Sequence, residues 1–264
     1  MMNARQIAYR TGAVSLLRQA RLDGPIAQIY YKTMDWYHRS HRHQKSRLAF
    51  HSQFIASGDL CFDVGANVGT RTALFLELGA RVVCVEPQES CVNVLRSAYA
   101  TNSNVIIVDK ALGDRSGQGE LLVSTHDHVL STLSPHWSDE GRFASQHVWD
   151  MRQQVSIVTL DSLIAQYGMP RFCKIDVEGF ELAVLRGLSH CIPVLSFEIV
   201  SEFRTEAQQC LDYLESLGPV VFNFSWGDSM KMMLPNWVGA NVLLEKIGVA
   251  YDRALWGDVY AKFL

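Results

Sequence analysis

The chain has 264 residues and a net charge of −3, and 48% of its residues are hydrophobic while 19% are charged. This balance is typical of a folded globular protein and excludes a disordered chain. No apolar run reaches the roughly 18 residues of a membrane-spanning helix, and the N-terminus lacks the features of a secretory signal. We therefore expect a cytoplasmic protein without a transmembrane segment.

Residues 1–56 are predicted to form a helical N-terminal appendage ahead of a larger domain over residues 57–264. Asp23-Gly24-Pro25 gives a helix start signal, and apolar residues then recur at helical spacing. The first fifty residues carry nine Lys or Arg against two Asp or Glu. These basic side chains either form a solvated helix face or contact an anionic partner.

From Leu60 onward, short apolar runs alternate with helical patterns, which predicts an α/β fold with a mostly parallel sheet and helices on both faces. The apolar runs predicted as strands span residues 60–64, 81–85, 105–108, 155–160, 170–176, 193–200 and 220–224. Residues 111–123 are predicted to form a β-hairpin inserted after the third strand. Residues 240–244 are predicted as a last antiparallel strand.

Residues 124–154 have no clean period and are rich in His, Ser, Trp and Asp. A compact domain rarely keeps so long an irregular stretch unless it covers a site. We therefore predict a lid on the substrate side of the domain. His126, His128 and His136 lie in it, and each is a candidate base, although most such histidines are surface residues.

The stretch from Leu60 to Thr70 predicts a strand, a tight loop with Gly65 and Gly69, and a helix, which is the usual setting of a nucleotide-like ligand. The loop lacks the lysine of a phosphate-binding P-loop and the spacing of a dinucleotide fingerprint. Asp63 favours an ammonium group over a phosphate. Glu86, at the end of the second strand, is placed to bond both hydroxyls of a ribose. S-adenosylmethionine combines these groups.

A second acidic motif, Lys174-Ile-Asp176-Val-Glu178, follows the predicted strand 170–176. Alternate residues of an extended segment face the same way, so these three side chains are expected to share one side. We predict that Asp176 orients an acceptor and removes its proton, and that Lys174 keeps Asp176 ionised. Glu178 or Glu198 is expected to hold the acceptor.

Two further expectations concern the same acidic residues. Glu181 is expected to bond the amides where the next helix begins, which is a structural role. Asp176, Glu178 and Glu198 have the hard oxygen ligands that a divalent cation prefers. The sequence shows no further oxygen-rich cluster, and its six cysteines form no Cys-x-x-Cys pair. No metal is therefore predicted.

These motifs, in this order over roughly residues 58–200, resemble those of the FkbM-family S-adenosylmethionine-dependent methyltransferases. The segments that carry the resemblance are 63–69, 85–87, 111–114, 159–163, 174–181, 184–187 and 197–198. The resemblance implies a Rossmann-like class I methyltransferase fold with a seven-stranded sheet. It also implies methylation of hydroxyl oxygens, often on sugars or natural-product scaffolds. The residues expected at the cofactor are Asp63, Gly65, Ala66, Asn67, Gly69, Thr70, Glu86, Pro87, Ala111 and Leu112.

The sequence thus predicts an O-methyltransferase that acts on a hydroxyl of a small molecule, sugar or glycan. One alternative is a methyltransferase acting on nucleic acid, which the basic N-terminus favours. Against it, the fourth strand ends in Asp-Val-Glu-Gly rather than in the Asn/Asp-Pro-Pro-aromatic run of many amino-methylating enzymes, so we expect no nucleic-acid partner. Another alternative is a scaffold that binds S-adenosylmethionine without turnover. A homo-oligomer is left open.

Overall fold

The computed structural model describes residues 41–124, 130–141, 148–250 and 256–264. Residues 51–264 form one compact unit, and the chain up to Phe50 forms another. The described part of the first unit lies in helix α4 (His41–His51). The helix predicted after Pro25 lies outside the described residues, and the division predicted after residue 56 stays a prediction.

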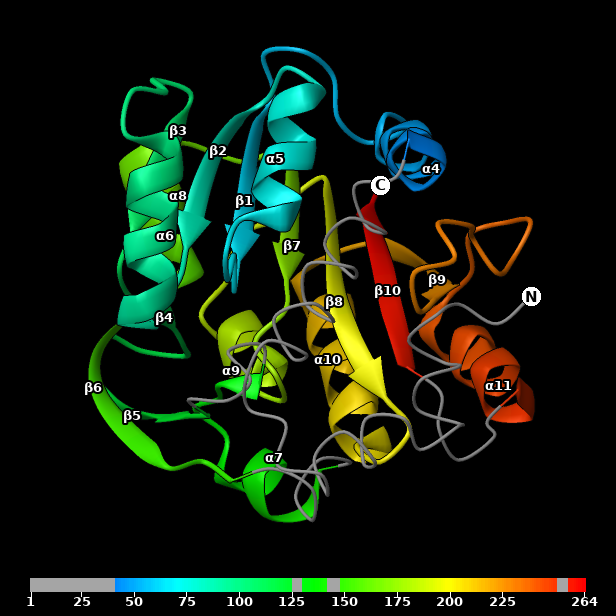
Figure 1. Ribbon diagram of the computed structural model, residues 1–264. Coiled ribbons are helices and arrows are strands. Elements are labelled where there is room, and N and C mark those ends of the chain that lie inside the picture. The colour runs from blue at the N-terminus through cyan, green and yellow to red at the C-terminus, as the bar shows by residue number, and fades with distance from the viewer. Residues whose placement is uncertain (1–40, 125–129, 142–147, 251–255) are drawn as a thin grey trace, which may run out of the picture. The chain divides into compact units, whose positions relative to one another are not determined.

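A seven-stranded sheet forms the centre of the larger unit, in the order β3-β2-β1-β7-β8-β10-β9 (Figure 1). Its strands are β1 (Leu60–Val64), β2 (Arg81–Val85), β3 (Val105–Val108), β7 (Phe172–Ile175), β8 (Val194–Val200), β9 (Val220–Trp226) and β10 (Trp256–Phe263). The five strands from β3 to β8 run parallel, and β10 is antiparallel to both of its neighbours. The Rossmann-like, mostly parallel seven-stranded sheet expected from the sequence is confirmed.

Helices cover both faces of this sheet. They are α5 (Thr70–Glu77), α6 (Glu89–Tyr99), α8 (Leu160–Tyr167), α9 (Glu181–Arg186), α10 (Arg204–Leu217) and α11 (Ala240–Ala250). Cys173 of β7 belongs to the core that α8, α9 and α10 cover. Because side chains alternate along a strand, its neighbours Phe172 and Lys174 face the opposite side. There the ring of Phe172 meets Phe75 of α5, with ring centroids 5.6 Å apart.

The hairpin predicted over residues 111–123 is wrong. Strands β4 (Ala111–Leu112) and β5 (Gly117–Val123) do not pair with each other but flank β6 (Met151–Val158), which forms a small sheet in the order β4-β6-β5. β6 runs parallel to β4 and antiparallel to β5. The turn residues after Leu112 correctly indicated that the chain reverses there. However, β6, which comes much later in the chain, lies between β4 and β5.

The strand predicted at residues 240–244 is also wrong, because this segment begins α11. Leu243 and Ile247 are both fully buried four residues apart, which is the spacing of a helix face. The last antiparallel strand is β10 instead. Among the described residues, no helix combines the length and apolar character needed to cross a bilayer.

The segment predicted as an irregular lid contains regular structure. Helix α7 (Pro135–Glu140) begins after Ser134, whose side chain accepts the backbone N–H of Trp137. β6 begins at Met151, several residues before the predicted start. Elements as short as α7 and β6 repeat their pattern too few times for a period to be recognised in the sequence, which explains the error. His126 and His128 lie outside the described residues.

Candidate active site

The loop after β1 lies directly against the end of β7. Gly65 has φ of 75°, and a Cβ atom built on it would overlap the carbonyl oxygen of Asp176. The N–H groups of Gly65 and Ala66 both donate to the carbonyl of Val85, at 2.9 and 3.0 Å. Only glycine therefore fits at the first loop position, and the loop joins the ends of β1, β2 and β7.

Gly69 fixes the other end of this loop. Its φ is 86°, and a Cβ atom there would come within 2.8 Å of Leu95 and 3.1 Å of Tyr99. The Tyr99 hydroxyl donates to the Gly69 carbonyl at 3.3 Å. Gly69 is the N-cap of α5 and leaves its first turn without a side-chain cap. Backbone amides at such a helix start can face a ligand.

Glu86 holds the middle of the loop. Its carboxylate accepts the N–H of Asn67 at 2.7 Å and that of Gln88 at 2.8 Å, one on each oxygen. The side chain is 6% exposed, and burial raises the pKa of Glu86 to about 7. Asn67 is itself left-handed, with φ of 52°. A carboxylate oxygen has two lone pairs, so Glu86 retains acceptor sites for the ribose hydroxyls predicted from the sequence.

Asp63 lies deeper in the fold than the sequence suggested. It is 1% exposed and accepts the Thr72 hydroxyl at 2.6 Å. Burial raises the pKa of Asp63 above its ordinary value. Its carboxylate therefore anchors α5 to β1, and its contact with a ligand ammonium group stays a prediction.

The remaining residues predicted at the cofactor occupy mixed environments. Ala66 is buried, whereas Thr70 is exposed at the start of α5. The Pro87 carbonyl accepts the side-chain N–H of Gln153 at 2.7 Å. Ala111 and Leu112 are buried in β4, where their backbones pair with β6. Their predicted contact with adenine stays a prediction.

The three predicted acceptor-side acids come together, two of them just after β7 and Glu198 within β8. Carboxylate oxygens of Asp176, Glu178 and Glu198 lie within 4.8 Å of one another. Glu178 adopts a left-handed conformation with φ of 52°, directly before the left-handed Gly179. Burial raises the pKa of Glu198 well above its ordinary value, and the negative charge of Asp176 raises it further. We refer to these three residues as the acid cluster.

Lys174 lies beneath the acid cluster and is 3% exposed. Its Nζ is 2.8 Å from Asp258 Oδ1 and 3.3 Å from Asp176 Oδ2. Burial by itself would lower the pKa of Lys174, but the charges of Asp176 and Asp258 raise it above its ordinary range. The predicted pairing of Lys174 with Asp176 is present, and Asp258 is the closer partner.

Asp258 and Arg71 also belong to the site, although no sequence pattern indicated them. Asp258 lies in β10 opposite Glu198 of β8, a pairing between strands sixty residues apart in the chain that local patterns do not reveal. Arg71, on α5, forms an ion pair with Asp228 at 3.7 Å. Burial tends to lower the pKa of Arg71, but Asp228 and Asp258 raise it. Its Nη1 is buried without a hydrogen-bond partner among the described residues.

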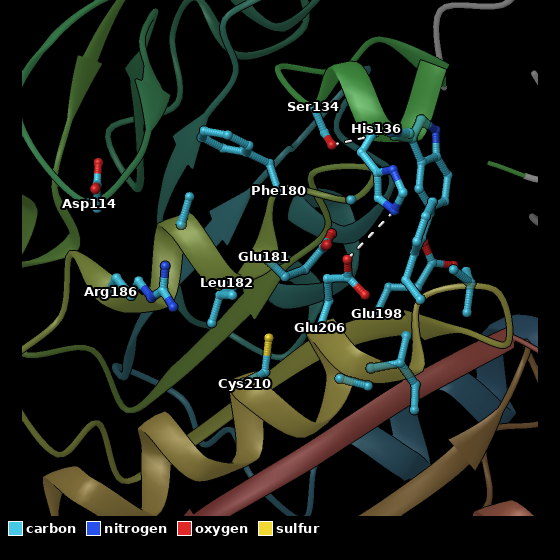
Figure 2. A pocket seen from close by; sticks show the side chains of 17 residues that line it. Asp114, Ser134, His136, Phe180, Glu181, Leu182, Arg186, Glu198, Glu206 and Cys210 are labelled. Atoms are coloured by element: carbon cyan, nitrogen blue, oxygen red, sulfur yellow. Dashed lines mark hydrogen bonds and ion pairs between the residues drawn. The ribbon is translucent and has the colours of Figure 1, made fainter. Parts of the chain in front are cut away.

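A pocket of about 220 Å³ adjoins the acid cluster (Figure 2). It is lined by residues of α7, α9, β8 and α10, and Glu198 belongs to both the pocket lining and the acid cluster. The ionisable groups and the cysteine that line it are Asp114, His136, Glu181, Arg186, Glu198, Glu206 and Cys210. We refer to it as the α7–α10 pocket.

Glu181 lies in this pocket and supports the loop before α9. It accepts the backbone N–H of Val177 at 3.0 Å, which is the kind of structural role expected from the sequence. The side chain is 7% exposed, and burial raises the pKa of Glu181 to about 7.

The described part of the predicted lid is hydrogen-bonded both near Glu86, on the proposed cofactor side of the site, and to the acid cluster on the acceptor side. The Ser131 hydroxyl donates to the Gln88 side chain at 2.9 Å, two residues beyond Glu86. The next hydroxyl, that of Thr132, donates to the Glu178 carbonyl at 2.7 Å. The ring nitrogens of His136 on α7 lie 3.7 Å from carboxylate oxygens of Glu140 and Glu206, and His136 lines the pocket.

Comparison with known proteins adds to this geometry. Residues 63–221 match the model of the methyltransferase FkbM domain. The chain is 24% identical over 203 residues to the hexuronic acid methyltransferase AglP of Haloferax volcanii, covering 74% of this chain and 77% of that protein.

Two solved structures are similar to the chain at low identity. The precorrin-6y C5,15-methyltransferase of Geobacter metallireducens is 10% identical, with a TM-score of 0.45 over 83% of this chain and 87% of that chain. The O-methyltransferase of Bacillus cereus in complex with SAH is 14% identical, with a TM-score of 0.43 over 84% of this chain and 80% of that chain.

Proposed function

The chain belongs to the FkbM methyltransferase family, and on that premise we propose that it transfers a methyl group from S-adenosylmethionine to a hydroxyl oxygen of a sugar or glycan. The main support for this proposal is the contact between the glycine loop and the acid cluster. Gly65 of the glycine loop packs against Asp176 of the acid cluster. A ligand on the loop therefore lies next to carboxylates that can hold an acceptor.

The glycine loop fits the proposed cofactor. Gly65 and Gly69 bring backbone close, and Glu86 is a carboxylate with unused lone pairs at the end of β2. These residues, together with Asn67, would hold the adenosine and methionine parts of the molecule. When bound, S-adenosylmethionine supplies the methyl group from its positively charged sulfur.

The acid cluster supplies the acceptor side of the reaction. Asp176 is 37% exposed in its side chain, so its carboxylate is open to an incoming hydroxyl and can accept that proton. Lys174, at 3.3 Å, stabilises the negative charge of Asp176. Glu178 and Glu198 can accept hydrogen bonds from neighbouring hydroxyls and so fix the position of the acceptor.

A carbohydrate acceptor is supported by two observations. The relative from Haloferax volcanii is named for a hexuronic acid, which is a sugar derivative. The α7–α10 pocket combines carboxylates with the aromatic side chains of Phe180 and Phe203. Polar groups among apolar walls are typical of small-molecule sites. We expect no nucleic acid as acceptor.

The proposal is tested by incubating the full chain with S-adenosylmethionine carrying a labelled methyl group and a panel of saccharides and glycans. We expect label in a product that survives mild alkali, because methyl ethers withstand base whereas methyl esters hydrolyse. Label only in alkali-labile product would indicate transfer to carboxylates. Absence of S-adenosylhomocysteine binding by calorimetry would overturn the whole proposal.

A further inference from the structure

We propose that the α7–α10 pocket is the sugar subsite of the acceptor and that it selects a saccharide ring without a carboxylate. This inference rests on the proposed function and deepens it, because it names the charge class of the acceptor. The relative from Haloferax volcanii is named for a hexuronic acid, so the pocket predicts a difference in acceptor from that protein.

The position of the pocket supports this assignment. Glu198 lines the pocket, and its carboxylate also lies within 4.8 Å of oxygens of Asp176 and Glu178. A ring in the pocket would therefore present a hydroxyl to the acid cluster. The backbone carbonyl of Asp176 packs against Gly65 of the glycine loop, so the acid cluster borders both the pocket and the proposed cofactor site.

The walls of the pocket suit a sugar ring. Phe180 and Phe203 supply apolar surface, and the His136 ring lies 4.7 Å from that of Phe203, between centroids. Carboxylates of Glu181, Glu198 and Glu206 gather at the centre of the view in Figure 2. Carboxylates accept hydrogen bonds from hydroxyls, and a ring with several hydroxyls can use more than one of them.

The charges that line the pocket disfavour an anion. Four carboxyl groups line it, those of Asp114, Glu181, Glu198 and Glu206, and they outnumber the basic side chains even though burial raises the pKa of Glu181 and of Glu198 and so reduces the charge of these two. The basic side chains are His136, whose Nε2 lies 3.7 Å from Glu206, and Arg186, which lies on the opposite side of the pocket from His136 (Figure 2).

The lysine next to the acid cluster does not change this balance. Lys174 does not line the pocket and is held by Asp258 and Asp176. A sugar carboxylate at the reacting end would therefore meet the negative charge of Asp176, and Lys174 beside it is already paired. Repulsion between like charges is one way in which a binding site excludes a ligand that otherwise resembles its substrate.

Equilibrium binding to the full chain saturated with S-adenosylhomocysteine tests the inference. The probes are methyl glucopyranoside, glucosamine and glucuronate, each titrated by ligand-observed NMR. We expect glucuronate to bind at least about tenfold more weakly than the other two, with a smaller difference at high salt. Glucuronate that binds as tightly as methyl glucopyranoside would overturn the inference.

Two variants distinguish the effect of a charge in the pocket from the effect of removing a carboxylate anywhere on the protein. Glu206→Gln removes one pocket carboxylate at a position that is 42% exposed, so the fold should tolerate it. It should reduce the discrimination against glucuronate about threefold or more, in the direction that loss of a like charge predicts. Glu245→Gln, at an exposed position of α11 outside the pocket lining, should leave the discrimination unchanged. Equal effects of both variants would contradict the assignment.

The same experiment distinguishes this inference from the proposed function. If S-adenosylhomocysteine does not bind, the proposed function fails. If it binds and none of the three sugars does, or if sugars bind without any response to Glu206→Gln, the subsite inference alone is overturned.

Discussion

Gly65 lies in van der Waals contact with the backbone of Asp176, so closely that no side chain fits between them. This contact joins the glycine loop after β1 to the acid cluster after β7. It explains how motifs more than a hundred residues apart in the chain form one site. The spacing between the proposed cofactor and the proposed base is therefore set by backbone, which is stiffer than side chains.

Gly65→Ala is predicted to weaken binding of S-adenosylhomocysteine by about tenfold or more. The added Cβ atom overlaps the Asp176 carbonyl, and φ of 75° adds strain on the order of 1–3 kcal/mol. Calorimetry of ligand binding and thermal unfolding measure both effects. Gly117→Ala is the matched control, because nothing lies within 4 Å of a Cβ atom there. Normal binding by Gly65→Ala would contradict the described packing.

Asp258→Asn is predicted to destabilise the protein by about 1.5–3 kcal/mol, because it removes the charged partner at 2.8 Å from the buried Lys174. Denaturant unfolding measures this change. Asp109→Asn provides a control at an ion pair of the same 2.8 Å length with Arg96, where both side chains are more than half exposed. Exposed pairs contribute about 0–1 kcal/mol. Equal losses in both variants would show that Lys174 does not depend on Asp258.

Glu181→Gln is predicted to flatten the decrease in stability between about pH 5 and pH 8. Burial raises the pKa of Glu181 from 4.5 to about 7. The folded state thus keeps a proton that the unfolded chain releases, and the free energy of unfolding falls as the pH rises through this interval, by up to about 3 kcal/mol. Glutamine still accepts the Val177 N–H.

Unfolding in denaturant across this pH range gives the measurement. Glu86, whose pKa burial also raises to about 7, contributes the same slope to both proteins and cancels in the comparison. Profiles that run parallel for Glu181→Gln and the original chain would contradict the prediction.

Methyl transfer is predicted not to require a divalent cation. The acid cluster has ligand atoms close enough together for one, but Lys174 already places a positive charge 3.3 Å from Asp176. Dialysis against a chelator should therefore leave the transfer rate unchanged. A loss of rate that added Mg²⁺ restores would show that Asp176, Glu178 and Glu198 hold a metal.

The sequence alone predicted most of the parallel sheet, because each buried strand is a short apolar run next to a helix or a turn. β1 and β2 lie at the residues expected. Two of the errors concern pairing between distant segments. β6 separates β4 from β5, and β10 supplies the final antiparallel strand, so local turn and strand signals identified the wrong partners.

As with the sheet, part of the candidate site could be predicted from the sequence and part could not. Asp176 and Glu178 were expected to share one side as alternate residues of an extended segment, and Glu178 or Glu198 was expected to hold the acceptor. The structure brings the three together, although β7 ends at Ile175, before both Asp176 and Glu178. Asp258 and Arg71 could not be found in this way. Asp258 depends on the register of β10 against β8, and Arg71 depends on how α5 packs against the sheet.

Asp176 is proposed to act on the acceptor in a methyl transfer whose donor binds elsewhere. Asp176→Asn tests this role, with labelled methyl transfer to the best saccharide and S-adenosylhomocysteine binding measured on the same sample. We predict a rate lower by about 10²–10⁴ with an unchanged dissociation constant for S-adenosylhomocysteine. Transfer by Asp176→Asn at the original rate would contradict this role of Asp176.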